Sequence, residues 1–168
     1  MTVGTLVSVE EYLNSNYDPD CDYIDGELIE RNMGEQNHGR LQARITQWLM
    51  ARENPSRYRT LVEVRLRVRR DRFRIPDLML IPVAAANEQI VTTPPLLCIE
   101  ILSPCDTFRS MWERISEYLA MGVPVCWIID PVNERAVCAT PGIWADVTDG
   151  ILRAGEIEMP LSEVLERQ

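Results

Sequence analysis

The stretch LLCIEIL, residues 96–102, decides the fold. It is an almost continuous apolar run, which is typical of a strand buried on both faces of a sheet. A helical pattern follows as far as Met121, with Asp106 as its predicted N-cap, and a second apolar run, VPVCWII, occupies residues 123–129. A strand–helix–strand unit of this kind predicts two parallel strands joined by a right-handed crossover.

Shorter elements surround that unit. Residues 36–52 place apolar side chains at helical spacing and predict an amphipathic helix. Residues 58–68 alternate, and residues 73–81 run back after a turn at 70–72, so the two segments predict one hairpin. Residues 135–139 are expected to pair with the strand at 123–129. The pattern predicts an α/β fold, a mixed β-sheet flanked by helices on both faces.

The two ends of the chain add small elements. Ser8 is the predicted N-cap of a short helix at 8–14, and the Asp25-Gly26 pair predicts an N-terminal β-hairpin over residues 23–31. The tail after Gly150 is polar, with a short helix expected from Ser162. A length of 168 residues predicts one domain over 1–168, with its core at about 36–140.

The composition limits the classes of function. The chain has 26 acidic and 17 basic residues, a net charge of −9, which excludes a cationic surface over the whole fold. All the basic residues are arginine, so any mechanism that needs a lysine base or nucleophile is excluded. No phosphate-binding glycine-rich loop and no G-x-S-x-G nucleophile motif occurs.

The cysteines and the N-terminus predict the compartment. The five cysteines are scattered without a C-x-x-C pair, and His38 is the single histidine, so no zinc site is expected. The chain shows neither a signal-peptide pattern nor an apolar run long enough for a membrane span. Together these features predict a reducing, cytoplasmic location.

Two acids stand where charge is energetically costly. Asp77 is the only charge in IPDLMLI, and Glu100 is the only charge in LLCIEIL. Two ionised carboxylates on neighbouring buried strands repel each other, and a divalent cation between them removes the repulsion. Magnesium accepts one or two carboxylates plus water and substrate phosphates. The simpler alternative is that each acid pairs with an arginine at a strand end.

This acid pair, Pro76-Asp77 followed by Glu100-Ile101-Leu102, resembles the pattern of PD-(D/E)XK nucleases. The chain most resembles one branch, the Uma-two family of restriction endonuclease-like proteins. The resemblance implies a restriction endonuclease-like fold and a magnesium- or manganese-dependent endonuclease acting on DNA. The matching segments, in order, are YIDGEL (23–28), His38, EVRLRV (63–68), RIPDL (74–78), EILSP (100–104) and YLAMGVPVCWIIDP (118–131).

The resemblance also assigns site residues. Asp77 and Glu100 are implied as ligands of the magnesium ion, which activates water and stabilises the leaving oxygen of a phosphodiester. Glu27 matches the acid of the family's D-G-E-L segment, and His38 matches its helix histidine. The alternatives are a solvated turn acid for Glu27 and an ordinary side chain at a helix start for His38.

One catalytic position departs from the pattern. The nuclease lysine is expected two residues after Glu100, where Leu102 stands, and in the Uma-two family it is displaced to the place of Arg114. Arginine can hold a phosphate through two hydrogen bonds, but it cannot deprotonate water. Either Arg114 supplies electrostatic stabilisation, or this protein has lost catalysis and serves as a DNA- or protein-binding module. The plainest alternative is a surface residue of the helix, one turn after Ser110.

Arginines gather on the hairpin. The segment from Arg57 to Arg74 holds eight arginines and two acids, a net charge of +6. A basic edge suits contacts with the DNA backbone, and the alternative is a solvated hairpin paired with the chain's own acids or with a second subunit. A homodimer is implied by the resemblance, and Trp112 leaves room for a dimer contact. The candidate DNA-binding residues are Arg65, Arg67, Arg69 and Arg72.

Overall fold

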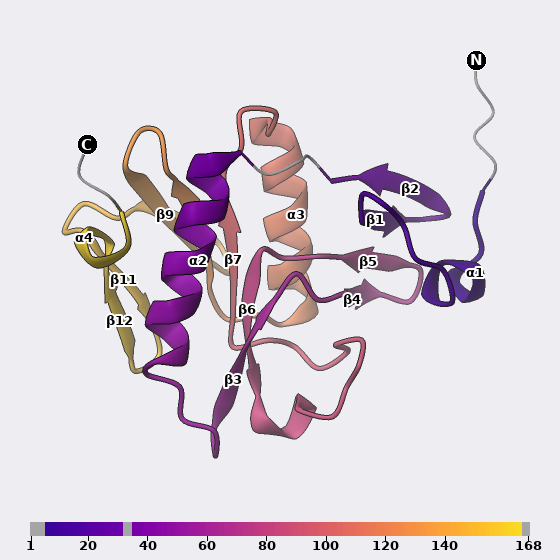
Figure 1. The fold of residues 1–168 in the computed structure, drawn as a ribbon, viewed down its shortest axis with the longest axis horizontal. Coiled ribbons are helices and arrows are strands. Elements are labelled where there is room, and N and C mark those ends of the chain that lie inside the picture. The colour runs from indigo at the N-terminus through magenta and orange to yellow at the C-terminus, as the bar shows by residue number, and fades with distance from the viewer. Residues whose placement is uncertain (1–5, 32–34, 166–168) are drawn as a thin grey trace.

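A computed structural model describes residues 6–31 and 35–165 and is built around a six-stranded mixed sheet (Figure 1). Strands β7 (Leu97–Ile101) and β8 (Cys126–Asp130) are parallel, and helix α3 (Phe108–Met121) joins them. The other neighbours are antiparallel. The crossover unit predicted from the two apolar runs is therefore confirmed. The strand order is β10 (Ile143–Asp146), β9 (Arg135–Thr140), β8, β7, β6 (Leu78–Pro82) and β3 (Tyr58–Val62).

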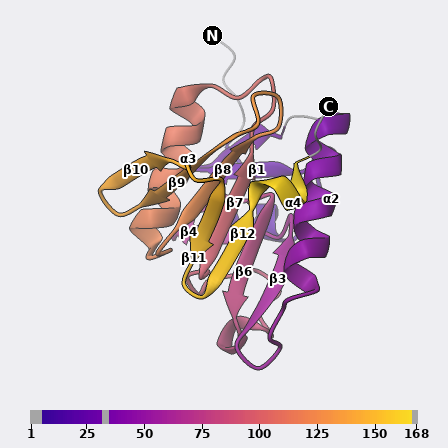
Figure 2. The same cartoon turned by 90° about the vertical axis from the view of Figure 1, so that its left-hand side faces the viewer.

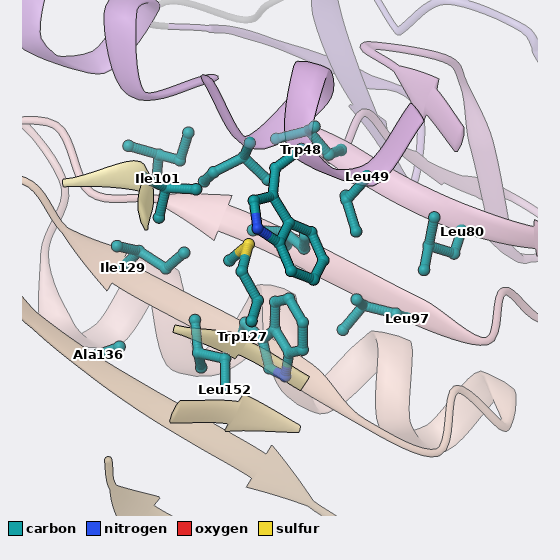
Figure 3. Close-up of a cluster of buried hydrophobic side chains, with 14 of the residues drawn as sticks. Trp48, Leu49, Leu80, Leu97, Ile101, Trp127, Ile129, Ala136 and Leu152 are labelled. Atoms are coloured by element: carbon teal, nitrogen blue, oxygen red, sulfur yellow. The ribbon is translucent and has the colours of Figure 1, made fainter. Parts of the chain in front are cut away.

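The central sheet has a helix on each face, as Figure 2 shows: α2 (Gln36–Met50) on one side and α3 on the other. Because side chains alternate along a strand, Leu97, Ile99 and Ile101 of β7 join the α2-side core, while Cys98 joins the α3-side core. Figure 3 shows Trp48 of α2 packed in the first core with Trp127 of β8. The expectation of helices on both faces is confirmed.

The predicted long hairpin at 58–81 forms two separate strand pairs. Its base, β3 with β6, belongs to the central sheet, whereas its tip, β4 (Leu66–Arg69) with β5 (Arg72–Arg74), belongs to another sheet. The chain leaves the central sheet between β3 and β4 at Glu63, whose φ is +52°. It returns between β5 and β6 at Pro76, which has no backbone N–H to donate to a ladder. The expectation of one continuous hairpin is wrong in this respect.

The tip of the hairpin forms a four-stranded sheet with the N-terminal segment. The order is β2 (Glu27–Glu30), β1 (Cys21–Ile24), β5 and β4. The Asp25-Gly26 turn has φ of +51° and +100°, which the mirror-image turns of tight hairpins require. Helix α1 (Val9–Leu13), capped by Ser8 as expected, packs Tyr12 against Tyr23 and Phe73. The N-terminal hairpin extension is confirmed.

Two local expectations need correction. The N-cap of α3 is Thr107, whose side chain accepts from the Ser110 N–H, whereas Asp106 accepts from the backbone N–H and the hydroxyl of Ser103 one turn earlier. The tail after Gly150 also forms a hairpin, because its apolar residues, such as Leu152 and Met159, are buried in the α2-side core. The expectation of a polar tail is wrong in this respect. Its elements are β11 (Ile151–Ala154), β12 (Ile157–Pro160) and α4 (Leu161–Val164).

Two smaller features complete the description. A short 3₁₀ helix, η1 (Val83–Ala85), follows β6. Within residues 6–31 and 35–165, no helix has the length and apolar character needed to cross a membrane.

Candidate active site

A cavity of about 350 Å³ lies where the N-terminal ends of α2 and α3 approach the carboxyl end of β7. Figure 1 shows both helix starts at the same end of the central sheet, with the β1–β2 hairpin beside them. Acids and arginines dominate the wall. Its charged residues, with the histidine, are Asp22, Glu30, Arg31, His38, Glu63, Arg74, Asp77, Asp106, Glu113 and Arg114.

Asp77 stands at the start of β6, is 3% exposed and has three donors around its carboxylate. Arg31 Nη2 donates to Oδ1 at 2.7 Å, the Ile101 N–H donates to Oδ2 at 2.7 Å, and His38 Nε2 lies 3.2 Å from Oδ2. Burial raises the pKa of Asp77, but His38, Arg31 and the Ile101 N–H together hold it below its usual value. Asp77 is therefore an ionised carboxylate at the cavity wall.

Glu100 is fully buried in β7, and each carboxylate oxygen has a donor. The Tyr118 hydroxyl donates to Oε1 at 2.6 Å, and Arg114 Nη1 donates to Oε2 at 2.7 Å. Burial, with the nearby charge of Asp77, outweighs the opposite effect of Arg114 and Tyr118 and raises the pKa of Glu100 to about 7. The carboxyl group of Glu100 therefore titrates near neutral pH.

The strand register brings the two acids together. Leu78 pairs with Ile99 in the antiparallel β6–β7 ladder, so continuing by one residue puts Asp77 opposite Glu100. Opposed residues in such a ladder point to the same face of the sheet with Cβ atoms about 4.5–5.5 Å apart. The adjacency of the two strands that carry the acids is confirmed, and convergence of the two carboxylates on one metal ion stays a prediction.

Arg114 lies between Glu100 and the cavity. Its side chain is 21% exposed, and its second amino group, Nη2, is 3.9 Å from Oδ1 of Asp106. The carboxylate of Glu100 raises the pKa of Arg114, and its Nε is buried without a hydrogen-bond partner among the described residues. Arg114 is thus a partly buried ion-pair partner with one donor unused, rather than an ordinary helix-surface residue.

The two weaker site predictions lie in different places. His38, in the first turn of α2, lines the cavity, and its hydrogen bond with Asp77 raises the pKa of the imidazole. Glu27 is exposed on β2 and is absent from the described residues that line the cavity. From the same hairpin, Asp22 does line it and accepts from Arg74 Nη1 at 2.9 Å and from the Ile75 N–H at 3.0 Å.

Sequence reasoning missed several partners of the two acids. Arg31 donates to Asp77, and Tyr118 donates to Glu100. Gln42 donates to the backbone carbonyl of Asp77 at 3.2 Å. Sequence reasoning also missed a pair that contacts neither acid, in which Glu117 accepts from Arg74 Nε at 2.6 Å. The one available signal was the position of Tyr118 on the apolar stripe of α3, where a buried hydroxyl needs a partner.

The hairpin arginines make contacts within the protein. Arg65 lies over the Tyr12 ring at 4.5 Å and donates to the Ser15 carbonyl at 3.1 Å. Arg67 donates to the Arg70 carbonyl at 2.7 Å, Arg69 lies 3.8 Å from Asp25, and Arg72 contacts Asp25 and Glu117. Their role in binding DNA stays a prediction.

The donor set has the chemistry that magnesium prefers. Among the described residues no group of three or more His, Cys, Asp or Glu side chains is placed to hold a metal. Magnesium, however, is usually held by one or two carboxylates, with water and phosphate oxygens completing the shell. Asp77 and Glu100 therefore fit it in donor type and register, with Arg114 as the competing cation at Oε2 of Glu100.

A mixed sheet with a parallel crossover, carrying opposed acids on two adjoining strands beside an open cavity, defines a restriction endonuclease-like α/β protein. The chain belongs to the Uma2 family, which is the Uma-two family that its motifs resemble. The family model described as "Putative restriction endonuclease" matches residues 9–165. The fold is similar to a crystal structure from Anabaena variabilis described as "a putative nuclease belonging to DUF820". That similarity has a TM-score of 0.81 at 21% identity, over 94% of this chain and 97% of the other. No curated protein matches the chain.

Proposed function

We propose that this protein is a magnesium-dependent phosphodiesterase that cleaves DNA, with Asp77 and Glu100 as the metal ligands. The observation that carries the proposal is the pair of buried acids at the adjoining strands β6 and β7. Asp77 lines the cavity, and Glu100 is fully buried and bonded to Arg114, which also lines it. When bound, the metal ion supplies a water of lowered pKa and neutralises charge on the phosphodiester. Manganese prefers the same oxygen donors, so it is expected to substitute for magnesium at this site.

The chain's own residues have definable parts in that reaction. Arg31 and His38 orient the Asp77 carboxylate, and Tyr118 orients that of Glu100. Arg114 is a permanent cation that cannot take a proton from water, so its part is electrostatic. Arg114 lines the cavity and its side chain is 21% exposed, so the exposed part of its guanidinium can donate to a phosphate oxygen there.

A second candidate function is a DNA- or protein-binding module without catalysis. It is favoured by the closed pairing of Glu100, because Arg114 and Tyr118 satisfy both carboxylate oxygens without any metal. In this alternative the fold keeps its acids as part of an internal ion-pair network.

Calorimetry with magnesium and manganese, joined to a plasmid-nicking assay, tests the proposal. The wild type is expected to bind about one ion per chain and to nick DNA, and Asp77→Asn is expected to do neither. The matched control Asp71→Asn removes an exposed acid on the hairpin turn and is expected to behave as wild type. Arg114→Lys is expected to keep activity, because it retains the positive charge.

The results separate the two candidate functions. No metal binding at millimolar concentration overturns the nuclease proposal. DNA binding without cleavage under those conditions then supports the binding module.

Three associated expectations remain predictions. The homodimer has a candidate surface in Trp112, which stacks on Trp144 with ring centroids 4.5 Å apart, and Trp112→Asp is expected to dissociate any dimer seen by sedimentation. The cytoplasmic location is supported by free thiols at all five cysteines. Phosphate contacts by the hairpin are best supported for Arg69, the exposed member of the four arginines.

A further inference from the structure

The outer side of α2 is a basic surface on an acidic protein. Residues 36–52 contain no aspartate or glutamate, although the chain has 26 acids and a net charge of −9. The charged residues of this segment are the arginines at positions 40, 44 and 52, with His38 at its start. In Figure 2, α2 forms the outermost layer on its side of the central sheet. This local excess of positive charge is complementary to a polyanion.

The same side of α2 is hollowed. A cavity of about 610 Å³ is lined by Arg40, Arg44 and Arg52, with Gln47 between them and Glu163 of α4 at the rim. Two exposed alanines, at positions 43 and 51, also line the cavity, and their short side chains do not fill it. Arg40 and Arg44 also border a smaller hollow toward the start of the helix. The arginines therefore stand along a groove rather than on a flat face.

Packing holds the far end of this groove in place. The Arg52 guanidinium lies 4.0 Å over the Trp48 ring, and Trp48 Nε1 donates to Glu163 Oε2 at 2.6 Å. Arg44 Nη2 donates to the Glu163 carbonyl at 3.3 Å. Guanidinium groups held in this way lose less conformational entropy when they bind a phosphate.

The groove and the candidate active site share α2 as a wall. His38, Gly39 and Gln42 face the site, while Arg40 and Arg44 face the groove. An α-helix is about 10 Å across, and successive nucleotides of a duplex strand rise by about 3.4 Å, so a few nucleotides cross the exposed N-terminal half of α2. A backbone seated in the groove can therefore continue into the site.

We propose that Arg40, Arg44 and Arg52 on the outer side of α2 bind the phosphate backbone of the DNA that enters the candidate active site. This inference rests on the proposed function for the identity of the polyanion. It adds α2 to the β4–β5 hairpin as a candidate backbone-binding surface. Arg44 and Arg52 also contact Glu163, so a phosphate competes with that acid for Arg52.

The test is the salt-dependent binding of a fluorescent DNA duplex in EDTA, which prevents cleavage. Arg40→Gln/Arg44→Gln is compared with Arg135→Gln/Arg153→Gln, a control with the same change of net charge at exposed positions of strands β9 and β11. The α2 variant is expected to bind about tenfold more weakly, with the salt slope reduced by about 2, because each lost phosphate contact reduces it by about 0.9. The control is expected to change by less than about twofold, and unchanged urea midpoints confirm that both variants fold.

Four outcomes overturn the inference, and they differ in what they leave standing. Equal weakening by both double variants shows only a bulk charge effect, and no weakening by the α2 variant places the DNA elsewhere. Displacement of DNA by poly-glutamate as effectively as by unlabelled DNA points to an acidic protein partner. Absence of DNA binding by the wild type overturns the proposed function itself, whereas the first two outcomes leave it intact.

Discussion

Replacing Arg114 with methionine isolates the energy of the buried Arg114–Glu100 pair. The substitution keeps a long side chain on α3 but leaves Tyr118 as the remaining side-chain donor to Glu100. Breaking a buried pair by removing one partner costs about 3–5 kcal/mol. Because Arg114 is 21% exposed, we expect a loss near the lower end of that range wherever Glu100 is ionised.

The titration of Glu100 makes this loss depend on pH. With a folded-state pKa of about 7 for Glu100, the pair at pH 5.5 joins Arg114 to a largely neutral carboxyl group, and its loss costs about 1–2 kcal/mol as a hydrogen bond. At pH 8 the wild-type carboxyl is ionised, whereas in the variant its pKa rises further and it stays protonated. One pH unit above a pKa of about 7 is worth about 1.4 kcal/mol, so the loss grows to about 3 kcal/mol.

Urea unfolding at pH 5.5 and pH 8, followed through tryptophan fluorescence, measures both losses. Arg109→Met is the control, because that side chain is 88% exposed in a pair with Glu113, and it is expected to cost less than about 0.5 kcal/mol at either pH. A loss that is equal at the two pH values, or larger at pH 5.5, refutes the assignment of a raised pKa to Glu100.

The remaining predictions concern the same network. Tyr118→Phe is expected to lower the free energy of unfolding by about 1–3 kcal/mol, measured by urea unfolding, because it leaves one buried Glu100 oxygen without its donor. Wild-type stability is expected to fall as pH rises, because a raised folded-state pKa favours folding only while the proton is bound. The loss extends from 4.5 to about 7 for Glu100, and His38 adds to it above 6.5; unfolding midpoints that rise over this interval contradict both shifts. Asp22→Ala is expected to cost about 1–3 kcal/mol by thermal unfolding, because it leaves buried Arg74 Nη1 and the Ile75 N–H without their acceptor while Glu117 still neutralises Arg74, and no measurable cost contradicts a structural role of Asp22.

The sequence identifies the central sheet because its pattern there is unambiguous. The runs at 96–102 and 123–129 are apolar on both faces, and a helix long enough for a crossover separates them. The break in the hairpin at Glu63 was not predictable from alternation, because it depends on pairing with β1, which lies some 50 residues away along the chain. The β11–β12 hairpin was missed because each of its strands is only four residues long, which is too short for an alternating pattern to predict a strand. Leu152 and Met159 nevertheless reach the core.

For the candidate site, the sequence revealed the two acids but not what surrounds them. Asp77 and Glu100 stand out because each is the sole charge in an apolar run. Glu27 was selected by its match to the family's D-G-E-L segment, whereas the acid of this hairpin that lines the cavity is Asp22, on a short strand whose pattern does not show which side chain points inward. Arg31 is 46 residues from Asp77 in sequence, so no local pattern indicates their ion pair.

Arg114 links the structural and the catalytic arguments. A lysine at this position could release Glu100 by losing its proton, whereas the charge of an arginine persists at every accessible pH. The Arg114–Glu100 pair can therefore open only when something else neutralises Glu100, and a metal ion or a proton can do so. A phosphate group in the cavity also favours opening of the Arg114–Glu100 pair, because the Arg114 guanidinium then binds the phosphate in place of the Glu100 carboxylate. Metal and DNA are therefore expected to bind cooperatively, because each weakens the Arg114–Glu100 pair, which opposes the binding of the other. Weaker metal binding in the presence of a non-cleavable DNA duplex contradicts this coupling.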